Sequence, residues 1–392
     1  MQNNRCKQLT VLHVISSLER GGTETVLVSL VSNSSSHIRH IVVSLQDSGL
    51  FGGILRSSGV DVIELRMKRR RIPLFAALRL LTIIKKIKPD VVQTWMYHSD
   101  FLGGLISRLA GVRAVVWGIH SFNLDKDKIS FSSRFLSWLS ARLSSMVPAA
   151  IVCCSERAAQ VHQDIGYQAD KFVIIPNGCD LSRFFVDPIT RNKKRAEWGI
   201  ASHELLLGMV ARFDPQKDHA NLLCALALLA KQSIKFRCIL VGKGMEQDNV
   251  ALSSQIDRLD LSDHLILAGP QNDIPAIMNA LDLHVLSSSG EAFPMVVIEA
   301  MACGTPCVVT DVGDTALIVG NTGWIVPPKD AAALAHGIAE GLSVLREKGR
   351  DRIGLVCRER VAERFTIQKM EQSYQELWWR LEKSRGVKCT TC

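Results

Sequence analysis

Short runs of β-branched and apolar residues alternate with longer helical stretches along most of this chain, and that alternation limits the possible folds more than any other feature. The runs are Val11–Ile15, Ile41–Leu45, Val60–Ile63, Val91–Thr94, Ala114–Trp117, Ala150–Cys153, Phe172–Ile175, Leu205–Val210, Cys238–Val241, Leu265–Leu267, Leu283–Leu286 and Val308–Val309. Strands that alternate with helices build βαβ units, whose strands pair in parallel. The sequence therefore predicts an α/β fold with doubly wound parallel sheets.

The alternation pauses once, which indicates two domains. Residues 176–185 are rich in turn formers, a basic stretch follows to Glu197, and the strand pattern then restarts. A chain of 392 residues is also longer than one ordinary core supports. We expect one Rossmann-like domain over residues 1–185 and a second over 186–365. Residues 366–392 read as a helix that crosses back to the first domain, with Met370, Tyr374 and Trp378 at helical spacing.

The excess of positive over negative charge is confined to the first half. Residues 1–185 have a net charge of +10 and residues 186–392 have −1, within a total of +9. Such asymmetry suggests that one domain faces an anionic surface or substrate. Only 6% of residues are aromatic and no nucleic-acid-binding motif occurs, so we expect no nucleic acid partner. An anionic lipid surface or a phosphate-linked acceptor fits the charge better.

Neither a membrane span nor a metal site is expected. The sequence has no run of 18 apolar residues, and its polar start lacks the core of a signal peptide, which predicts a cytoplasmic protein. The eleven cysteines are mostly scattered, so neither a disulfide framework nor a zinc pattern is indicated, and the terminal Cys389–Cys392 reads as an uninvolved tail.

The segment from Leu281 to Thr310 carries the most chemical information. It reads as a strand, a serine-rich loop, a helix opened by Pro294 in its first turn, and a second strand. Glu291 falls in the loop, and Glu299 falls inside a helix that is otherwise apolar. A buried carboxylate is costly unless it is paired or hydrogen-bonded. Glu299 therefore needs a partner, which could be a ligand or a structural cation, while Glu291 could be a ligand residue or a solvated loop acid.

Three other groups follow strands at the edge where open α/β sheets bind ligands. Arg212 and Lys217 could neutralise a diphosphate or form an ordinary basic turn. The bare backbone of Gly21 and Gly22 could approach a phosphate or make a tight turn. Gly242 and Gly244 resemble the start of a dinucleotide fingerprint, but Gln247 replaces its third glycine.

Several short motifs add to this pattern in a fixed order. They are Gly21-Gly-Thr-Glu24, Pro89-Asp-Val-Val92, Trp95-Met-Tyr-His98, Trp117-Gly-Ile-His120, Pro176-Asn-Gly178, Ala211-Arg-Phe-Asp-Pro-Gln-Lys217, Gly242-Lys-Gly244 and the Glu291-x7-Glu299 helix. Together they resemble family 4 of the glycosyltransferases over nearly the whole chain. The resemblance implies the GT-B fold, in which two Rossmann-like domains face a cleft.

The resemblance also implies roles for individual residues. Glu299 would accept hydrogen bonds from the donor ribose, Glu291 would hold the transferred sugar, and Arg212 with Lys217 would lie at the diphosphate. His120 would contact the donor sugar near the reacting carbon, unless it is only a core or loop residue. His98 would shape the acceptor side or merely cap the helix that starts near Asp100. The remaining donor-binding positions are Gly21, Gly22, Gly242, Gly244, Phe293, Pro294 and Met295.

The implied activity is a retaining, metal-independent transfer of a sugar from a nucleotide diphosphate donor, most often a UDP sugar, to a glycan or lipid-linked acceptor in cell-surface polysaccharide synthesis. No cofactor is expected. Two alternatives stay open: a sugar-nucleotide epimerase or hydrolase of the same fold, and a non-catalytic subunit that binds sugar nucleotides. Lys68–Lys88 and Ser130–Leu143 could bind the inner face of the membrane peripherally, or could be ordinary domain helices.

Overall fold

The chain consists of two compact units in a computed structural model that describes residues 8–19, 21–32, 37–67, 74–120 and 131–384. The first unit contains Met1–Gly178 together with Ile367–Cys392, and the second contains Cys179–Thr366. The sequence analysis placed the end of the first domain seven residues later, at 185. The basic run Lys68–Arg71 and the terminal Cys389–Cys392 lie outside the described residues.

The first unit is built on a sheet of seven parallel strands in the order β3-β2-β1-β4-β5-β6-β7. The order reverses between β1 and β4, where Val11 lies opposite Val91. The strands are β1 (Leu9–Ile15), β2 (Ile38–Ser44), β3 (Asp61–Glu64), β4 (Val91–Trp95), β5 (Val115–Ile119), β6 (Ala150–Cys153) and β7 (Phe172–Ile174).

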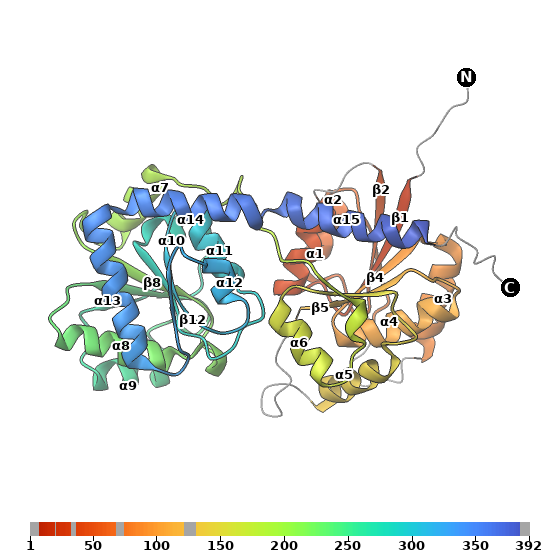
Figure 1. Cartoon of the computed structure of the whole chain (residues 1–392), viewed down its shortest axis with the longest axis horizontal. Coiled ribbons are helices and arrows are strands. Elements are labelled where there is room, and N and C mark those ends of the chain that lie inside the picture. Colours follow the sequence, from red (N-terminus) through yellow and green to blue (C-terminus); the bar gives the residue numbers. More distant parts are fainter. Residues whose placement is uncertain (1–7, 20, 33–36, 68–73, 121–130, 385–392) are drawn as a thin grey trace, which may run out of the picture. The chain divides into compact units, whose positions relative to one another are not determined.

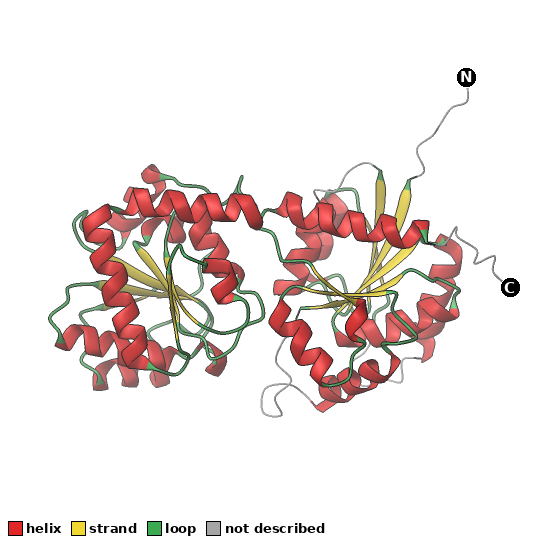
Figure 2. Ribbon diagram, viewed as in Figure 1, coloured by secondary structure: helices red, strands yellow, loops and turns green. Residues whose placement is uncertain are grey.

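Helices cover both faces of this sheet, as Figures 1 and 2 show. They are α1 (Gly22–Ser32), α2 (Gly49–Ser57), α3 (Leu74–Ile87), α4 (Tyr97–Leu109), α5 (Phe131–Leu143), α6 (Glu156–Asp164) and α15 (Ile367–Lys383), with the 3-10 turn η1 (Ala169–Lys171). The last helix packs on the first unit because Met370, Tyr374, Leu377 and Trp378 join its buried core. The expected return of the chain end to the first domain is confirmed.

The second unit repeats this plan with six parallel strands in the order β10-β9-β8-β11-β12-β13, and its order reverses between β8 and β11. Its strands are β8 (Leu206–Val210), β9 (Arg237–Val241), β10 (Leu265–Leu267), β11 (Leu283–Leu286), β12 (Cys307–Thr310) and β13 (Trp324–Val326). Its helices are α7 (Pro188–Glu197), α8 (His219–Lys231), α9 (Val250–Arg258), α10 (Ile274–Ala280), α11 (Met295–Ala302), α12 (Thr315–Val319), α13 (Ala331–Lys348) and α14 (Arg350–Arg364), with the 3-10 turn η2 (Pro215–Lys217).

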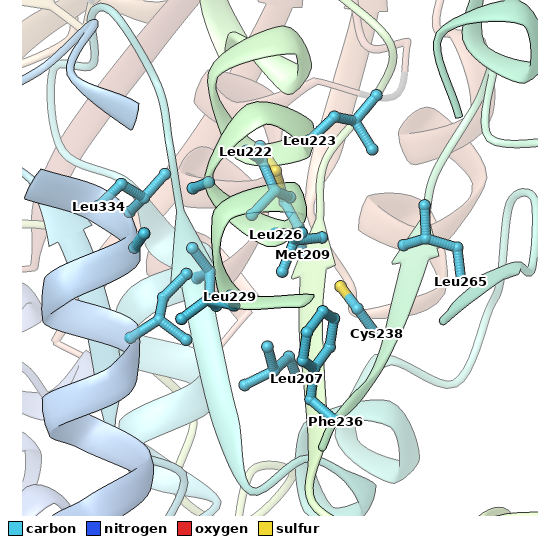
Figure 3. Packing of buried hydrophobic residues seen from close by; sticks show 14 of the residues in the cluster. Leu207, Met209, Leu222, Leu223, Leu226, Leu229, Phe236, Cys238, Leu265 and Leu334 are labelled. Atoms are coloured by element: carbon cyan, nitrogen blue, oxygen red, sulfur yellow. The ribbon is translucent and has the colours of Figure 1, made fainter. Parts of the chain in front are cut away.

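Leucine side chains from α8 fill the space over strands β8 and β9 of the second unit. Figure 3 shows Leu222, Leu226 and Leu229 packed towards Leu207 and Cys238, and all five are fully buried. This packing fixes β8 and therefore the start of the loop that follows it. The predicted α/β class with two Rossmann-like domains is confirmed.

Two details of the sequence analysis were wrong. Strand β13 was missed, because only three residues follow the Asn321–Gly323 turn and such a short run carries no clear periodicity. Pro294 does not lie in the first turn of its helix but at the N-cap of α11, with φ −73° and ψ 103°. The ring fixes φ near this value in either place, so the sequence could not separate the two positions.

Among the described residues, no helix has both the length and the apolar character that a membrane span requires.

Candidate active site

A group of charged side chains lies where the strand order of the second unit reverses. Ligands of open α/β sheets bind outside the carboxyl ends of the strands at such a point. The loop after β8 carries Arg212 and Lys217, and the loop after β11 carries Glu291. The Nζ atom of Lys217 lies 2.5 Å from Oε1 of Glu291, and their side chains are 19% and 11% exposed. Two residues that lie 74 positions apart in sequence thus form one partly buried ion pair.

Further hydrogen bonds tie these two loops together. The backbone nitrogen of Ser289 donates to the carbonyl of Gln216 at 2.8 Å, and the Gln216 amide donates to the carbonyl of Gly290 at 2.6 Å. The Ser288 hydroxyl donates to Oε1 of Glu291 at 2.6 Å. The ion pair therefore has a rigid frame. Gln216 and Ser288 were not among the predicted site residues, because a lone Gln or Ser in a loop carries no sequence signal.

Arg212 stands at the exposed rim of the same site. Its Nε atom donates to Oδ2 of Asp214 at 3.1 Å, and its side chain is 64% exposed. Exposed ion pairs contribute about 0–1 kcal/mol, so this contact holds the guanidinium only weakly. Arg212 is therefore available to an anionic ligand, whereas Lys217 is already paired.

Glu299 is a largely buried acid whose charge the protein compensates only weakly. It lies in the second turn of α11, and none of the described residues donates a hydrogen bond to its carboxylate. Burial raises its pKa to about 7, and the charge of Arg183 opposes that shift only partly. The alternative to a ligand, a structural salt bridge, is not present among the described residues. A ligand with hydroxyl donors would supply what the helix leaves unsatisfied.

Gly242 and Gly244 of the second unit occupy backbone positions that leave no room for a side chain. Gly242 has φ 142°, and a Cβ atom there would lie 2.1 Å from the carbonyl oxygen of Ala211. Gly244 also has positive φ, and a Cβ there would meet the side chain of Phe213. Both glycines let the loop after β9 pack against the loop that carries Arg212. Their predicted contact with the donor stays a prediction.

Gly313 supports the acidic loop and was missed as a site residue. Its φ is 57°, and a Cβ atom would lie 2.2 Å from the carbonyl oxygen of Glu291. Of the other predicted donor contacts, Phe293 is 5% exposed and packs edge-on against Phe365, which is a core role. Pro294 is buried, and Met295 is half-buried at the start of α11.

In the first unit, His120 directly follows β5, next to the reversal point. Its ring stacks on Trp95, with 5.2 Å between centroids and 21° between planes. Both ring nitrogens are buried, and none of the described residues hydrogen-bonds to them. Burial lowers the pKa of His120 to about 4, so the imidazole is neutral at pH 7.

The remaining predicted residues of the first unit lie at the ends of β1 and β4. Gly22 begins α1, and a Cβ there would meet no atom within 4 Å. The carbonyl of Gly21 accepts a hydrogen bond from the Thr25 hydroxyl at 2.8 Å. His98 is exposed in the first turn of α4, and partial desolvation lowers its pKa. It does not cap that helix, since Met96 occupies the N-cap position.

Two family models match successive parts of the chain. The model described as Glycosyltransferase Family 4 matches residues 20–183, and the one described as Glycosyl transferases group 1 matches residues 190–353. The two matches together cover most of the chain.

Relatives and solved structures agree with these matches. The UDP-Gal:alpha-D-GlcNAc-diphosphoundecaprenol alpha-1,3-galactosyltransferase of Escherichia coli is 26% identical over 77% of this chain and 78% of its own length. The N,N'-diacetylbacillosaminyl-diphospho-undecaprenol alpha-1,3-N-acetylgalactosaminyltransferase of Campylobacter jejuni is 26% identical over 77% of this chain and 80% of its own length. The crystal structure of Anabaena Alr3699/HepE in complex with UDP superposes with a TM-score of 0.81 at 23% identity, over 95% of this chain and 100% of that one.

Proposed function

We propose that this chain, which belongs to glycosyltransferase family 4 and is a glycosyltransferase, transfers a sugar from a nucleotide diphosphate donor. The acceptor would be a glycan or a lipid-linked sugar in cell-surface polysaccharide synthesis. One observation carries the proposal. Arg212 and the Lys217–Glu291 pair lie at the point where the second sheet reverses its strand order. The same unit contains Glu299, to which none of the described residues donates a hydrogen bond.

The four charged side chains suit the parts of such a donor. Departure of the nucleotide diphosphate builds negative charge on the leaving oxygen, and fixed cations stabilise that charge. Lys217 and Arg212 would supply the cations, so the reaction would need no metal ion. Glu291 would hold hydroxyls of the transferred sugar, and Glu299 would accept hydrogen bonds from the ribose. Gly242, Gly244, Pro294 and Met295 would line the same donor site.

A UDP sugar is the donor that we propose, and a polyprenyl-diphosphate-linked sugar is the acceptor. The name of the Escherichia coli relative specifies a UDP sugar, and HepE was solved with UDP. The names of both bacterial relatives specify diphosphoundecaprenol acceptors, which carry negative charge. An anionic acceptor matches the net charge of +10 on residues 1–185, where His98 would lie on the acceptor side.

We also propose that transfer retains the anomeric configuration of the donor. In the reaction that family members use, the departing phosphate takes the acceptor proton on the same face of the sugar. Neutral His120 would contact the sugar near the reacting carbon without adding charge there. The anomeric proton coupling of the product, measured by NMR, would show inversion if this part of the proposal is wrong.

A lipid-linked acceptor would bring the protein to a membrane, and the first unit offers a surface for that. Helix α4 packs beside both α3 and α5 (Figure 1), and apolar side chains on these helices are exposed. Phe75 is 79% exposed and Trp138 is 49% exposed, with the guanidinium of Arg142 over the Trp138 ring at 5.1 Å. Aromatic side chains beside cations suit an anionic bilayer surface. We propose peripheral association with the cytoplasmic face of the membrane.

Thermal unfolding in the presence of nucleotide sugars tests the donor proposal directly. A ligand that binds only the folded state raises the melting temperature by mass action. UDP sugars should raise it at concentrations where GDP and ADP sugars do not, and Glu299→Gln should reduce the shift. An equal shift with all three nucleotides, or none with any, would contradict the assignment of the donor.

A further inference from the structure

The ring of His120 stacks on the indole of Trp95, with 21° between the two planes. Trp95 is the last residue of β4 and His120 follows β5, the neighbouring strand. Rotation about the second side-chain torsion of histidine is broad, so a hydrogen bond usually fixes the ring. None of the described residues hydrogen-bonds to His120. The parallel face of the Trp95 indole therefore fixes the plane in which the two ring nitrogens lie.

Trp95 is itself held from a second side. Its Nε1–H group donates to Nδ1 of His13 at 3.3 Å, and His13 Nε2 lies 2.8 Å from Nδ1 of His40. Since Nδ1 of His13 accepts a hydrogen bond from Trp95, the proton of the neutral His13 ring must be on Nε2, which then donates a hydrogen bond to His40. This series of hydrogen bonds requires both histidines to be neutral, and burial does lower the pKa of each.

The last helix closes this group of rings. The ring centroid of Tyr374, in α15, lies 6.0 Å from that of Trp95. Trp378 packs edge-on against His13, with 5.7 Å between the ring centroids. The Trp378 Nε1–H group donates to Oε1 of Gln93 at 3.3 Å. All of these side chains are in the first unit, so the end of the chain holds the surface on which His120 rests.

We propose that Trp95 is a positioning residue for His120. The indole, which is held by His13 and by α15, keeps the plane of the imidazole in the orientation that contacts the donor sugar. The inference rests on the proposed contact between His120 and that sugar. It differs from that contact because Trp95 would act on the reaction only through the orientation of the imidazole. Its loss should lower kcat more than it changes the KM for the donor.

Replacing Trp95 by leucine tests this, with Trp117→Leu as the matched control. Trp117 is just as buried and lies in β5, but it packs in the core on the other face of the sheet, against Tyr167 at 6.3 Å. A displacement of about 1 Å in a reacting group can cost roughly 100-fold in rate. We expect kcat to fall about 30- to 100-fold in Trp95→Leu, with KM nearly unchanged, and to fall much less in Trp117→Leu.

The orientation of the ring can be read without any assay. The Trp95 ring current should shift the ring protons of His120 upfield in an NMR spectrum of histidine-labelled protein, with the signal assigned through His120→Gln. That shift should vanish in Trp95→Leu and persist in Trp117→Leu. If the leucine variants do not fold, Trp95→Phe and Trp117→Phe replace them, and only Trp95→Phe should lower kcat.

The outcomes separate this inference from the proposed function. A fully active His120→Gln enzyme would overturn the proposed role of His120 and the inference with it. An inactive His120→Gln enzyme combined with an unimpaired Trp95 variant would overturn the inference alone. A fall in kcat for the Trp95 variant that the Trp117 variant matches would show a general effect on the fold, which also contradicts it.

Discussion

In the folded protein, the carboxyl group of Glu299 changes its protonation state near neutral pH. Burial raises its pKa from 4.5 to about 7, so the folded protein binds this proton more tightly than the unfolded chain does. The free energy of unfolding therefore falls as the pH rises from about 4.5 through about 7. Above that range Glu299 is fully ionised, and its effect on the free energy of unfolding no longer changes with pH. Bound hydroxyl groups would stabilise the ionised form and offset this cost.

Donor affinity should therefore depend on pH through Glu299. We expect the affinity for a UDP sugar, measured by titration calorimetry, to rise between pH 6 and pH 8. In Glu299→Gln it should be flat and weaker by roughly 10- to 100-fold, the range for a hydrogen bond to a charged group. Glu371→Gln is the control, because Glu371 has the same raised pKa of about 7 but lies in α15 of the first unit. Equal pH dependence in the two variants would remove Glu299 from the donor site.

Arg212 and Lys217 should differ in their effect on stability although both serve the same anion. Removing either cation should lower kcat by about 100- to 1,000-fold, as for other groups that stabilise developing charge. Lys217→Met also leaves Glu291 nearly buried and unpaired, which typically destabilises by about 3–5 kcal/mol. Arg212→Met breaks only an exposed pair, so its melting temperature should stay near that of the wild type. Two variants with equal loss of stability would contradict this division.

At the level of elements, the unit from β11 to β12 could be predicted well because each boundary has its own chemical signal. Each change of secondary structure is marked in the sequence, in turn by the apolar strand, the serine loop, the proline and Gly304. The order of strand and helix is confirmed. The ion pair between Lys217 and Glu291 could not be predicted in the same way. It depends on β8 and β11 being neighbours in the sheet, which follows from the three-dimensional strand order and not from either segment.

Gly313 should be essential for the loop that presents Glu291. Alanine at this position has an unfavourable φ and also meets the carbonyl oxygen of Glu291 at 2.2 Å. Gly199 is the control, since its φ is 65° but a Cβ there would meet nothing within 4 Å. Gly199→Ala should cost about 1–2 kcal/mol from backbone strain alone. Gly313→Ala should cost more in chemical denaturation and should also weaken donor binding; equal costs and normal binding would show that the loop does not depend on this contact.

For the whole molecule, the two-domain α/β architecture follows from strand and helix alternation, while the aromatic group around Trp95 does not. His13, Gln93, Trp95 and Trp378 come from three elements and from both ends of the chain. Sequence periodicity assigns Trp378 to the buried face of a helix but cannot say which side chains it meets. The supporting residues of His120 therefore appear only in the structure.

The exposed aromatic residues of α3 and α5 predict how the whole protein distributes between water and lipid. The double variant Phe75→Ser/Trp138→Ser should sediment less with vesicles that contain phosphatidylglycerol, by roughly 10-fold or more in partition coefficient, because about 25 cal/mol is lost for each Å² of apolar surface withdrawn from lipid. Ile189→Ser is the control, since Ile189 is 81% exposed but lies in the second unit. Unchanged sedimentation of the double variant would rule out this surface.

The most direct test of the account is sugar transfer itself. Wild-type protein and Glu291→Gln are incubated with radiolabelled UDP sugars and a polyprenyl-diphosphate-linked sugar, and the labelled lipid product is extracted and counted. The wild type should transfer label from at least one UDP sugar, and Glu291→Gln should transfer at least 100-fold less, since it loses both the contact with the sugar and the pair with Lys217. Release of only free or epimerised sugar by the wild type, or equal transfer by both proteins, would contradict the account.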